Sequence, residues 1–195
     1  MTGSALADSS AGYGAVTRAF HGAIAALVLW QFAMVLAYRL LGEHNATLNA
    51  IYGVAPHGPV GLLVLLLVIP RAVWAFANRK RRPSYGAGPA GRLARTAHTL
   101  IYALLFLVPA VAVVRQYGKG KGWDVFGIRL FEPTGVTNDT LVAIADATHS
   151  PMSWTLLALI GGHAAAAALH GLVWKDRVVG RMFGRRAQAL DAAAQ

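Results

Sequence analysis

The segment that decides the fold runs from His149 to Trp174 and reads HSPMSWTLLALIGGHAAAAALHGLVW. Between Ser150 and Trp174 it contains no Asp, Glu, Lys or Arg, so it is long and apolar enough to cross a bilayer as one helix. Yet it carries three histidines: His149, His163 and His170. Because an imidazole is costly in hydrocarbon, we expect these side chains to face a bundle interior, where a ligand or partner satisfies them.

The spacing of these histidines indicates two levels in the membrane. His149 and His163 are 14 residues apart, which in a helix means nearly the same face and an axial separation of about 21 Å. Two such groups favour two stacked cofactors, and haem iron commonly takes axial imidazole. Small residues within 161–168 would let a flat macrocycle or a neighbouring helix approach His163. The alternative is a set of core histidines hydrogen-bonded across helices.

The composition restricts the class of protein and the type of haem. With 195 residues, 56% of them hydrophobic and 13% charged, the chain is typical of a small integral membrane protein of one domain. It has no cysteine, which excludes disulfides, Cys-ligated iron–sulfur clusters and covalently attached c-type haem. Any haem would therefore be of the b type.

The pattern of apolar runs predicts an all-α fold, an integral membrane four-helix bundle. We expect spans over about residues 16–38, 57–77, 96–114 and 150–174. These spans form one domain over residues 13–186, which the chain extends with flexible tails over residues 1–12 and 187–195.

The charges assign an orientation to this bundle. The N-terminal segment, the connection between the second and third spans with Arg71, and the C-terminal tail hold 13 Lys and Arg against three acids, whereas the other two connections hold five against five. The positive-inside rule then places both termini in the cytoplasm. Since the whole net charge of +10 is cytoplasmic, anionic membrane lipid explains it, and no role in nucleic-acid binding is needed.

Alternation of the helices sorts the histidines by depth. His57 and His149 both begin helices that run inward, so they lie near the outer surface. His21 lies near the inner surface, at the depth of His163. The sequence therefore predicts an outer haem b between His57 and His149 and an inner haem b between His21 and His163, built in the bundle core.

Three further residues near the inner face have open roles. His98 or His170 could replace an inner ligand, hydrogen-bond to a haem propionate or a quinone carbonyl, or pair with another helix. Arg71 is either a snorkelling residue at a helix end or a contact to a propionate.

Bis-histidine ligation leaves no open iron position, which favours electron transfer over oxygen binding. Two haems at different depths would carry electrons across the membrane, and quinone is the natural lipid-soluble partner near the inner haem. The candidate walls of a quinone site are His98, His170, Trp174 and Lys175.

Cations in the third connection are the candidate donor site. Set among glycines and aromatics, they could funnel a small anionic donor toward the outer haem, or they could be solvated loop charges. They are Arg115, Lys119, Lys121 and Arg129.

These residues together resemble the bacterial di-haem cytochrome b561 family over about Tyr13 to Arg186. The matching pieces are Tyr13 with His21 eight residues on, His57-x-x-x-Gly61 followed by Arg71, His98-x-x-x-Tyr102 with Pro109, Tyr117 with Phe126-Gly127, and His149, His163 and His170 ahead of Trp174-Lys175-Asp176. The cytochrome b subunits of formate dehydrogenases and hydrogenases look similar in plan.

The resemblance implies b-haem ligands on the first, second and fourth helices, which fall on His21, His57, His149 and His163. It also implies a quinone-reactive oxidoreductase of the bacterial inner membrane, with superoxide as periplasmic donor and ubiquinone as acceptor. The segment Gly118–Gly122 is more basic and glycine-rich than the family pattern, which indicates stronger anion capture or a different donor. The alternative is an anchoring electron-transfer subunit that serves a partner redox protein, a dehydrogenase or a c-type cytochrome.

Overall fold

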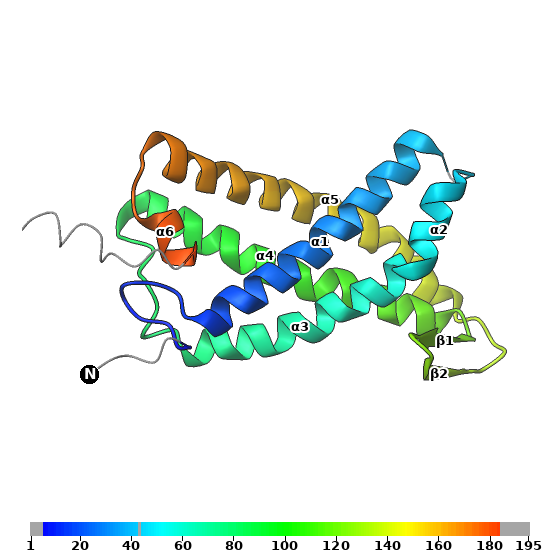
Figure 1. The fold of residues 1–195 in the computed structure, drawn as a ribbon. Coiled ribbons are helices and arrows are strands. Elements are labelled where there is room, and N and C mark those ends of the chain that lie inside the picture. Colours follow the sequence, from blue (N-terminus) through cyan, green and yellow to red (C-terminus); the bar gives the residue numbers. More distant parts are fainter. Residues whose placement is uncertain (1–5, 43, 184–195) are drawn as a thin grey trace, which may run out of the picture. The chain divides into compact units, whose positions relative to one another are not determined.

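The computed structural model describes residues 6–42 and 44–183 of the 195-residue chain. Within these residues the protein is mostly helical, with a two-stranded antiparallel hairpin (Figure 1). The elements in chain order are α1 (Ala15–Leu41), α2 (Ala46–Val54), α3 (His57–Ala77), α4 (Gly88–Gly118), β1 (Lys121–Val125), β2 (Ile128–Pro133), α5 (Asp139–Ala168), its π-helical continuation η1 (Leu169–Val173) and α6 (Val178–Phe183).

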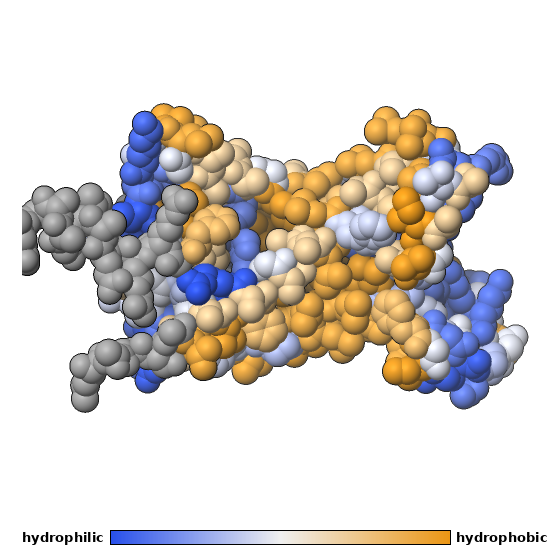
Figure 2. All heavy atoms as spheres, viewed as in Figure 1, coloured by the Kyte–Doolittle hydropathy of each residue, from blue (hydrophilic) through white to orange (hydrophobic). Residues whose placement is uncertain are grey.

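Among the described residues, four stretches are long and apolar enough to cross a membrane: Ala15–Leu41, Ala46–Ala77, Gly88–Gly118 and Asp139–Val173. At most 17% of the most apolar window of any of them is buried inside the protein. Figure 2 shows apolar side chains along α3 and hydrophilic ones gathered at the β1–β2 hairpin. An apolar surface of this extent requires a hydrocarbon surrounding. The prediction of an all-α membrane protein with four spans is confirmed.

Two helices begin earlier than the sequence predicted. The third begins at Gly88 rather than near residue 96, and the fourth at Asp139 rather than near residue 150. The predicted limits followed the edge of the apolar run, but a helix continues past the hydrocarbon wherever its charged residues reach water. Asn138 helps to fix the start of α5, because its side chain accepts a hydrogen bond from the backbone N–H of Leu141 at 3.1 Å.

The chain forms two compact units, and each long helix contributes a segment to both. We call the described residues 6–23, 69–102 and 158–183 the terminal unit, because it includes both ends of the described chain. Residues 24–68 and 103–157 form the hairpin unit, which includes β1 and β2.

The β1–β2 hairpin was not predicted from the sequence. Its turn is formed by Phe126 and Gly127, whose φ angles are 50° and 81°, and Val125 pairs with Ile128 across it. Two successive positive φ values are typical of the tight turns whose twist matches a hairpin. Stacking of Trp123 on Phe131, with ring centres 6.1 Å apart, adds a cross-strand contact.

The two units differ in what they bury. The buried Ala, Val, Leu, Ile and Met residues of the described chain all lie in the hairpin unit; they are Ile24, Val28, Met34, Leu48, Val60, Val64, Val68, Leu105, Val125, Ala145 and Leu156. In the terminal unit, by contrast, Asp8, Thr17 and Asn78 are buried. Polar contacts therefore have a larger part in holding the terminal unit.

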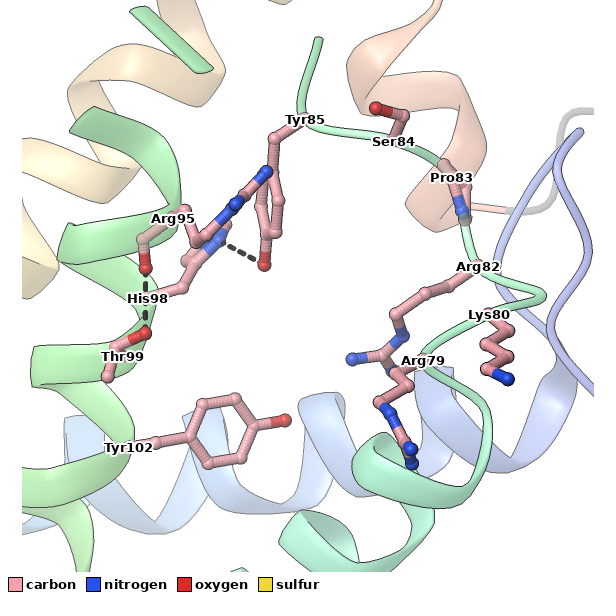
Figure 3. Close-up of a pocket in the computed structure, with 10 residues that line it drawn as sticks. All are labelled: Arg79, Lys80, Arg82, Pro83, Ser84, Tyr85, Arg95, His98, Thr99 and Tyr102. Atoms are coloured by element: carbon pink, nitrogen blue, oxygen red, sulfur yellow. Dashed lines mark hydrogen bonds between the residues drawn. The ribbon is translucent and has the colours of Figure 1, made fainter. Parts of the chain in front are cut away.

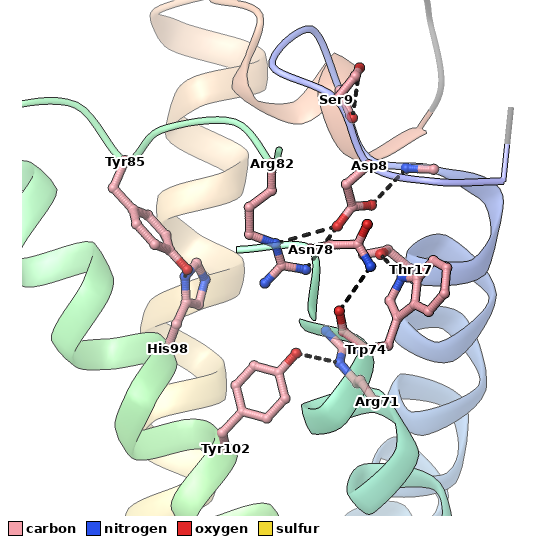
Figure 4. A network of polar contacts seen from close by, with 12 residues as sticks. Asp8, Ser9, Thr17, Arg71, Trp74, Asn78, Arg82, Tyr85, His98 and Tyr102 are labelled. Atoms are coloured by element: carbon pink, nitrogen blue, oxygen red, sulfur yellow. Dashed lines mark hydrogen bonds and ion pairs between the residues drawn. The ribbon is translucent and has the colours of Figure 1, made fainter. Parts of the chain in front are cut away.

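These polar contacts include residues for which we expected a flexible tail. Asp8 has a fully buried side chain that pairs with Arg82 at 3.0 Å and accepts a hydrogen bond from the N–H of Gly14 at 2.9 Å (Figure 4). Trp74 donates to Thr17 at 3.0 Å. Within residues 6–12, the carboxylate of Asp8 is thus buried and paired with Arg82. Residues 1–5 and 187–195 lie outside the described residues, and the flexibility of both tails stays a prediction.

Candidate functional site

In the hairpin unit, His57 and His149 come together from different helices. His57 is the first residue of α3 and His149 lies in α5. Their ring centres are 6.2 Å apart and the ring planes meet at 77°. These are the two residues that the sequence assigned to the outer level.

Backbone contacts orient this pair. Nδ1 of His149 lies 3.1 Å from the carbonyl oxygen of Val108. Since a carbonyl only accepts, Nδ1 carries the proton and Nε2 of His149 is left with a free lone pair. On the other side, Gln31 of α1 donates from Nε2 to the carbonyl of His57 at 2.7 Å, which ties α1 to the start of α3.

In the terminal unit, His21 of α1 and His163 of α5 form a second pair. Their ring centres are 6.3 Å apart, with an angle of 51° between the planes. The sequence assigned these two residues to the inner level.

His98 of α4 stands behind His163. Its Nε2 lies 3.2 Å from Nδ1 of His163, and its own Nδ1 lies 3.0 Å from the hydroxyl of Tyr85. Both ring nitrogens of His98 are therefore occupied by protein partners. This arrangement favours a position of His98 beside a haem ligand over ligation of haem by His98 itself.

Both pairs fit a metal held between two imidazoles. A metal–nitrogen bond of about 2 Å, with each ring centre about 1 Å beyond its nitrogen, places two opposed ring centres about 6 Å apart. The observed separations are 6.2 and 6.3 Å. In addition, Nδ1 of His57 is buried without a hydrogen-bond partner in the described part of the protein, which is unusual for a polar atom.

Arg71 lies in the terminal unit on α3. Its Nε donates to the hydroxyl of Tyr102 at 2.9 Å, and its guanidinium lies 5.3 Å from the centre of the Tyr102 ring. Arg71 is thus held by a side chain of α4.

His170 has different partners from His98. Its Nδ1 lies 2.5 Å from a carboxylate oxygen of Asp176, and its ring packs edge-on against Trp174 with centres 4.6 Å apart. The backbone N–H of Val178, and then His170, lower the pKa of Asp176 by hydrogen-bonding to its carboxylate. Lys175 is exposed. Of the predicted quinone-site residues, the structure joins His170 to Trp174 and places His98 with His163.

The cations of the candidate donor site, in the connection that follows α4, fall into two groups. Arg115 forms an ion pair with Asp146, and Arg129 pairs with Asp124 and Glu132. In residues 6–42 and 44–183, no carboxylate lies within ion-pair distance of Lys119 or Lys121. The charges of Lys119 and Lys121 are therefore not neutralised by an ion pair within the described residues.

Lys119 is the less exposed of these two lysines. Partial burial lowers its pKa below the usual value of 10.5, the neighbouring charge of Arg115 lowers it further, and Asp146 acts in the opposite direction. Lys121, the first residue of β1, is exposed.

Two residues of these sites were missed from the sequence. Tyr85 lies in a linker rich in Gly, Pro and Ser, where nothing marks it as a partner of His98. Gln31 did leave a signal, because it is an uncharged but strongly polar residue inside an otherwise apolar span.

The four membrane-length helices of residues 6–42 and 44–183 bring histidines together in pairs, which defines an integral membrane protein suited to hold a metal-containing prosthetic group. The chain belongs to the prokaryotic cytochrome b561 family, whose sequence pattern matches residues 12–185.

Several named proteins are similar to the chain. Cytochrome b561 homolog 2 of Escherichia coli strain K12 is 28% identical over 89% of this chain and 92% of its own length. Cytochrome b562 of Cereibacter sphaeroides strain ATCC 17023 is 29% identical over 90% and 97%. A probable superoxide oxidase, CybB, of Yersinia pestis is 28% identical over 67% and 74%.

Membership confirms the resemblance seen in the sequence and sets the general activity. The protein is a multi-pass bacterial membrane protein of electron transport, and its family carries b-type haem. The chemistry is that of an oxidoreductase.

Proposed function

We propose that the chain carries single electrons from an external donor, with superoxide as the leading candidate, to ubiquinone, using two b-type haems in the bacterial inner membrane. The observation that carries the proposal is the pairing of His57 with His149 and of His21 with His163 at ring separations of 6.2 and 6.3 Å. In each pair the two imidazoles come from different helices, so they would hold one haem between two elements of the bundle.

His57 and His149 would hold the outer haem, and His21 and His163 the inner one. Haem held by these histidines would supply a one-electron couple, and the hydrogen bonds that the histidines make would tune its potential. If two imidazoles held each haem, no iron position would remain open, and the residues would direct the site toward electron transfer and away from binding oxygen.

The hydrogen bonds behind the ligands select the nitrogen that faces the metal. The carbonyl of Val108 keeps the proton of His149 on Nδ1. His98 does the same for His163: if Nε2 of His163 binds iron, its Nδ1–H donates to Nε2 of His98, and Nδ1–H of His98 donates to Tyr85. Such outer partners orient a ligand and raise its basicity.

Lys119 and Lys121 would attract an anionic donor. Their charges have no paired carboxylate in the described residues, and like charges in one loop raise the local concentration of an anion. Arg115 is balanced by Asp146, so its contribution to attraction is smaller. The name of the relative from Yersinia pestis, a probable superoxide oxidase, supports superoxide as the donor.

On the acceptor side, we propose His98, His170 and Trp174 as residues near the quinone, with Lys175 beside them. His98 contacts a proposed haem ligand, which is the position that a short electron-transfer path requires. The packing of His170 on Trp174 offers a flat apolar face with a polar edge, to which a quinone ring and its carbonyl are complementary.

Rapid mixing tests the proposal. The purified, oxidised protein is mixed with superoxide while the haem absorption bands are followed, and ubiquinone is then added. We expect reduction of the haem within the mixing experiment and re-oxidation by the quinone. If superoxide leaves the haem oxidised while a chemical reductant and ubiquinone still act on it, the protein is an electron-transfer and anchoring subunit for a partner redox protein.

A further inference from the structure

The terminal unit contains a cavity of about 520 Å³, and its cationic lining residues have no part in the proposed electron transfer. It lies between the segment that follows α3 and the first turns of α4 (Figure 3). Figure 3 shows Arg79 and Arg82 on one side of the space, Tyr85, Arg95 and His98 on the opposite side, and Tyr102 between the two.

The lining of this cavity is strongly basic. It includes four cationic side chains, Arg79, Lys80, Arg82 and Arg95, and among the described lining residues there is no Asp or Glu. Arg82 is partly neutralised by Asp8, which approaches it at 3.0 Å. For Arg79, Lys80 and Arg95, no carboxylate of the described chain lies within ion-pair distance.

Neutral hydrogen-bond donors complete the lining. The hydroxyls of Ser84, Tyr85 and Tyr102 belong to lining residues, whereas the hydroxyl of Thr99, also in the lining, already donates to the carbonyl of Arg95 at 2.9 Å. Arg79 is held in place, because it donates to the carbonyl of Phe76 at 3.1 Å and lies 3.9 Å from the centre of the Phe76 ring. Several cations together with hydroxyl donors form the environment that a phosphate group prefers, since it offers multiple acceptor oxygens and negative charge.

The surroundings of the cavity also suit a lipid. Val73, Phe76 and Leu93 are 65%, 66% and 71% exposed, and they lie in the helices that border the cavity. Apolar side chains next to a basic pocket at the end of membrane-spanning helices match the two parts of an anionic phospholipid.

We propose that this cavity is a binding site for a phosphate group, supplied by the headgroup of an anionic phospholipid or by free phosphate. The juxtaposition of Arg79, Lys80 and Arg95 around one cavity without a carboxylate carries this assignment. It does not depend on which histidines bind haem.

The test uses the full-length, haem-loaded protein in detergent and native mass spectrometry. Phosphatidylglycerol or phosphatidylcholine is added at equal concentration, and the retained lipid is counted per chain. For the unsubstituted protein we expect at least about fivefold more phosphatidylglycerol than phosphatidylcholine. The double variant Arg79→Gln with Arg95→Gln should lose this preference. The control, Arg92→Gln with Arg177→Gln, removes the same charge outside the lining and should keep it.

A second arm distinguishes the two sources of phosphate. Inorganic phosphate is titrated by calorimetry into delipidated protein. Binding of phosphate to the unsubstituted protein but not to the Arg79 and Arg95 variant, together with no preference among the lipids, would identify free phosphate as the ligand. Equal retention of phosphatidylglycerol by the cavity variant and the control, with no binding of phosphate, would overturn the proposal.

The mass spectra also report haem content, which guards against a trivial loss of folding. The charge-keeping variant Arg79→Lys with Arg95→Lys should restore the lipid preference. If the Gln variant loses haem and retains phosphatidylglycerol, the cations serve the cofactor, and the phosphate site is ruled out.

Discussion

The ring of His98 stands directly behind that of His163, with Nε2 of His98 3.2 Å from Nδ1 of His163. The other ring nitrogen of His98, Nδ1, lies 3.0 Å from the hydroxyl of Tyr85. A metal ligand usually has such a partner on its second nitrogen, and the partner fixes the tautomer and raises the basicity of the ligand.

Replacement of His98 by alanine should therefore act through His163. We expect the inner haem to bind about 10- to 100-fold more weakly, and its reduction potential to rise, because a less basic ligand stabilises ferric iron less. Haem titration and a redox titration followed by absorbance measure the two effects. Tyr85→Phe, which removes only the more distant hydroxyl, should give the same changes in smaller size. An unchanged potential and affinity in His98→Ala would show that the contact with His163 has no role in ligation.

The four paired histidines should fall into two independent sets. His57→Ala or His149→Ala should remove one haem and leave the other, because each pair has its own ring contact. His21→Ala or His163→Ala should remove the second haem instead. Pigment extraction, with two haems per chain in the unsubstituted protein, measures the loss. Full occupancy of both sites in His21→Ala would assign the ligand role to His98 or His170.

The two lysines without a carboxylate partner should set the rate of reduction by an anion. The double variant Lys119→Glu with Lys121→Glu should slow reduction by dithionite or superoxide by about tenfold at low ionic strength, and the difference should shrink as salt screens the charges. Stopped-flow absorbance of the haem measures the rate. The matched control, Arg92→Glu with Arg177→Glu, changes the net charge equally in the other unit. Equal rates in the unsubstituted protein, the lysine variant and the control would show that the two lysines are solvated and do not attract the donor.

The same loop predicts a dependence on pH. Burial and the charge of Arg115 lower the pKa of Lys119 from its usual value of 10.5, so its positive charge is present below that lowered pKa and is lost as the pH rises through it. The rate of reduction by dithionite should therefore begin to fall at a lower pH than it would if Lys119 had the usual lysine pKa. Lys119→Arg, which stays charged, should move this fall to higher pH, and identical pH profiles for the two proteins would contradict the assignment.

The buried pair of Asp8 and Arg82 should stabilise the terminal unit. Asp8→Ala removes a fully buried carboxylate and leaves Arg82, whose side chain is 18% exposed, without its partner. We expect the free energy of unfolding to fall by about 2 to 3 kcal/mol, because Arg82 would remain partly buried without an opposite charge. Thermal unfolding in detergent, followed by haem absorbance, measures it. Asp176→Asn, which disrupts an exposed pair with His170, should have a smaller effect; equal shifts would show that burial of Asp8 contributes nothing.

The sequence by itself determined the four spans and the class of cofactor chemistry that paired intramembrane histidines allow, because a 3.6-residue period and the cost of imidazole in hydrocarbon are local properties of the chain. It could also assign His57 with His149 and His21 with His163 to common depths, and the structure brings each of these pairs together. Whether they bind haem stays a prediction.

Only the tertiary structure decided which residues stand behind the histidines and which charges remain unpaired. The contact of His98 with His163 and the pairing of Arg115 with Asp146 join helices that are far apart in the sequence. The cation-lined cavity, which residues 79–102 line, depends on how the segment after α3 folds back toward α4. Such contacts depend on the rotation and packing of each helix against the next, and the spacing of residues along one helix does not specify these.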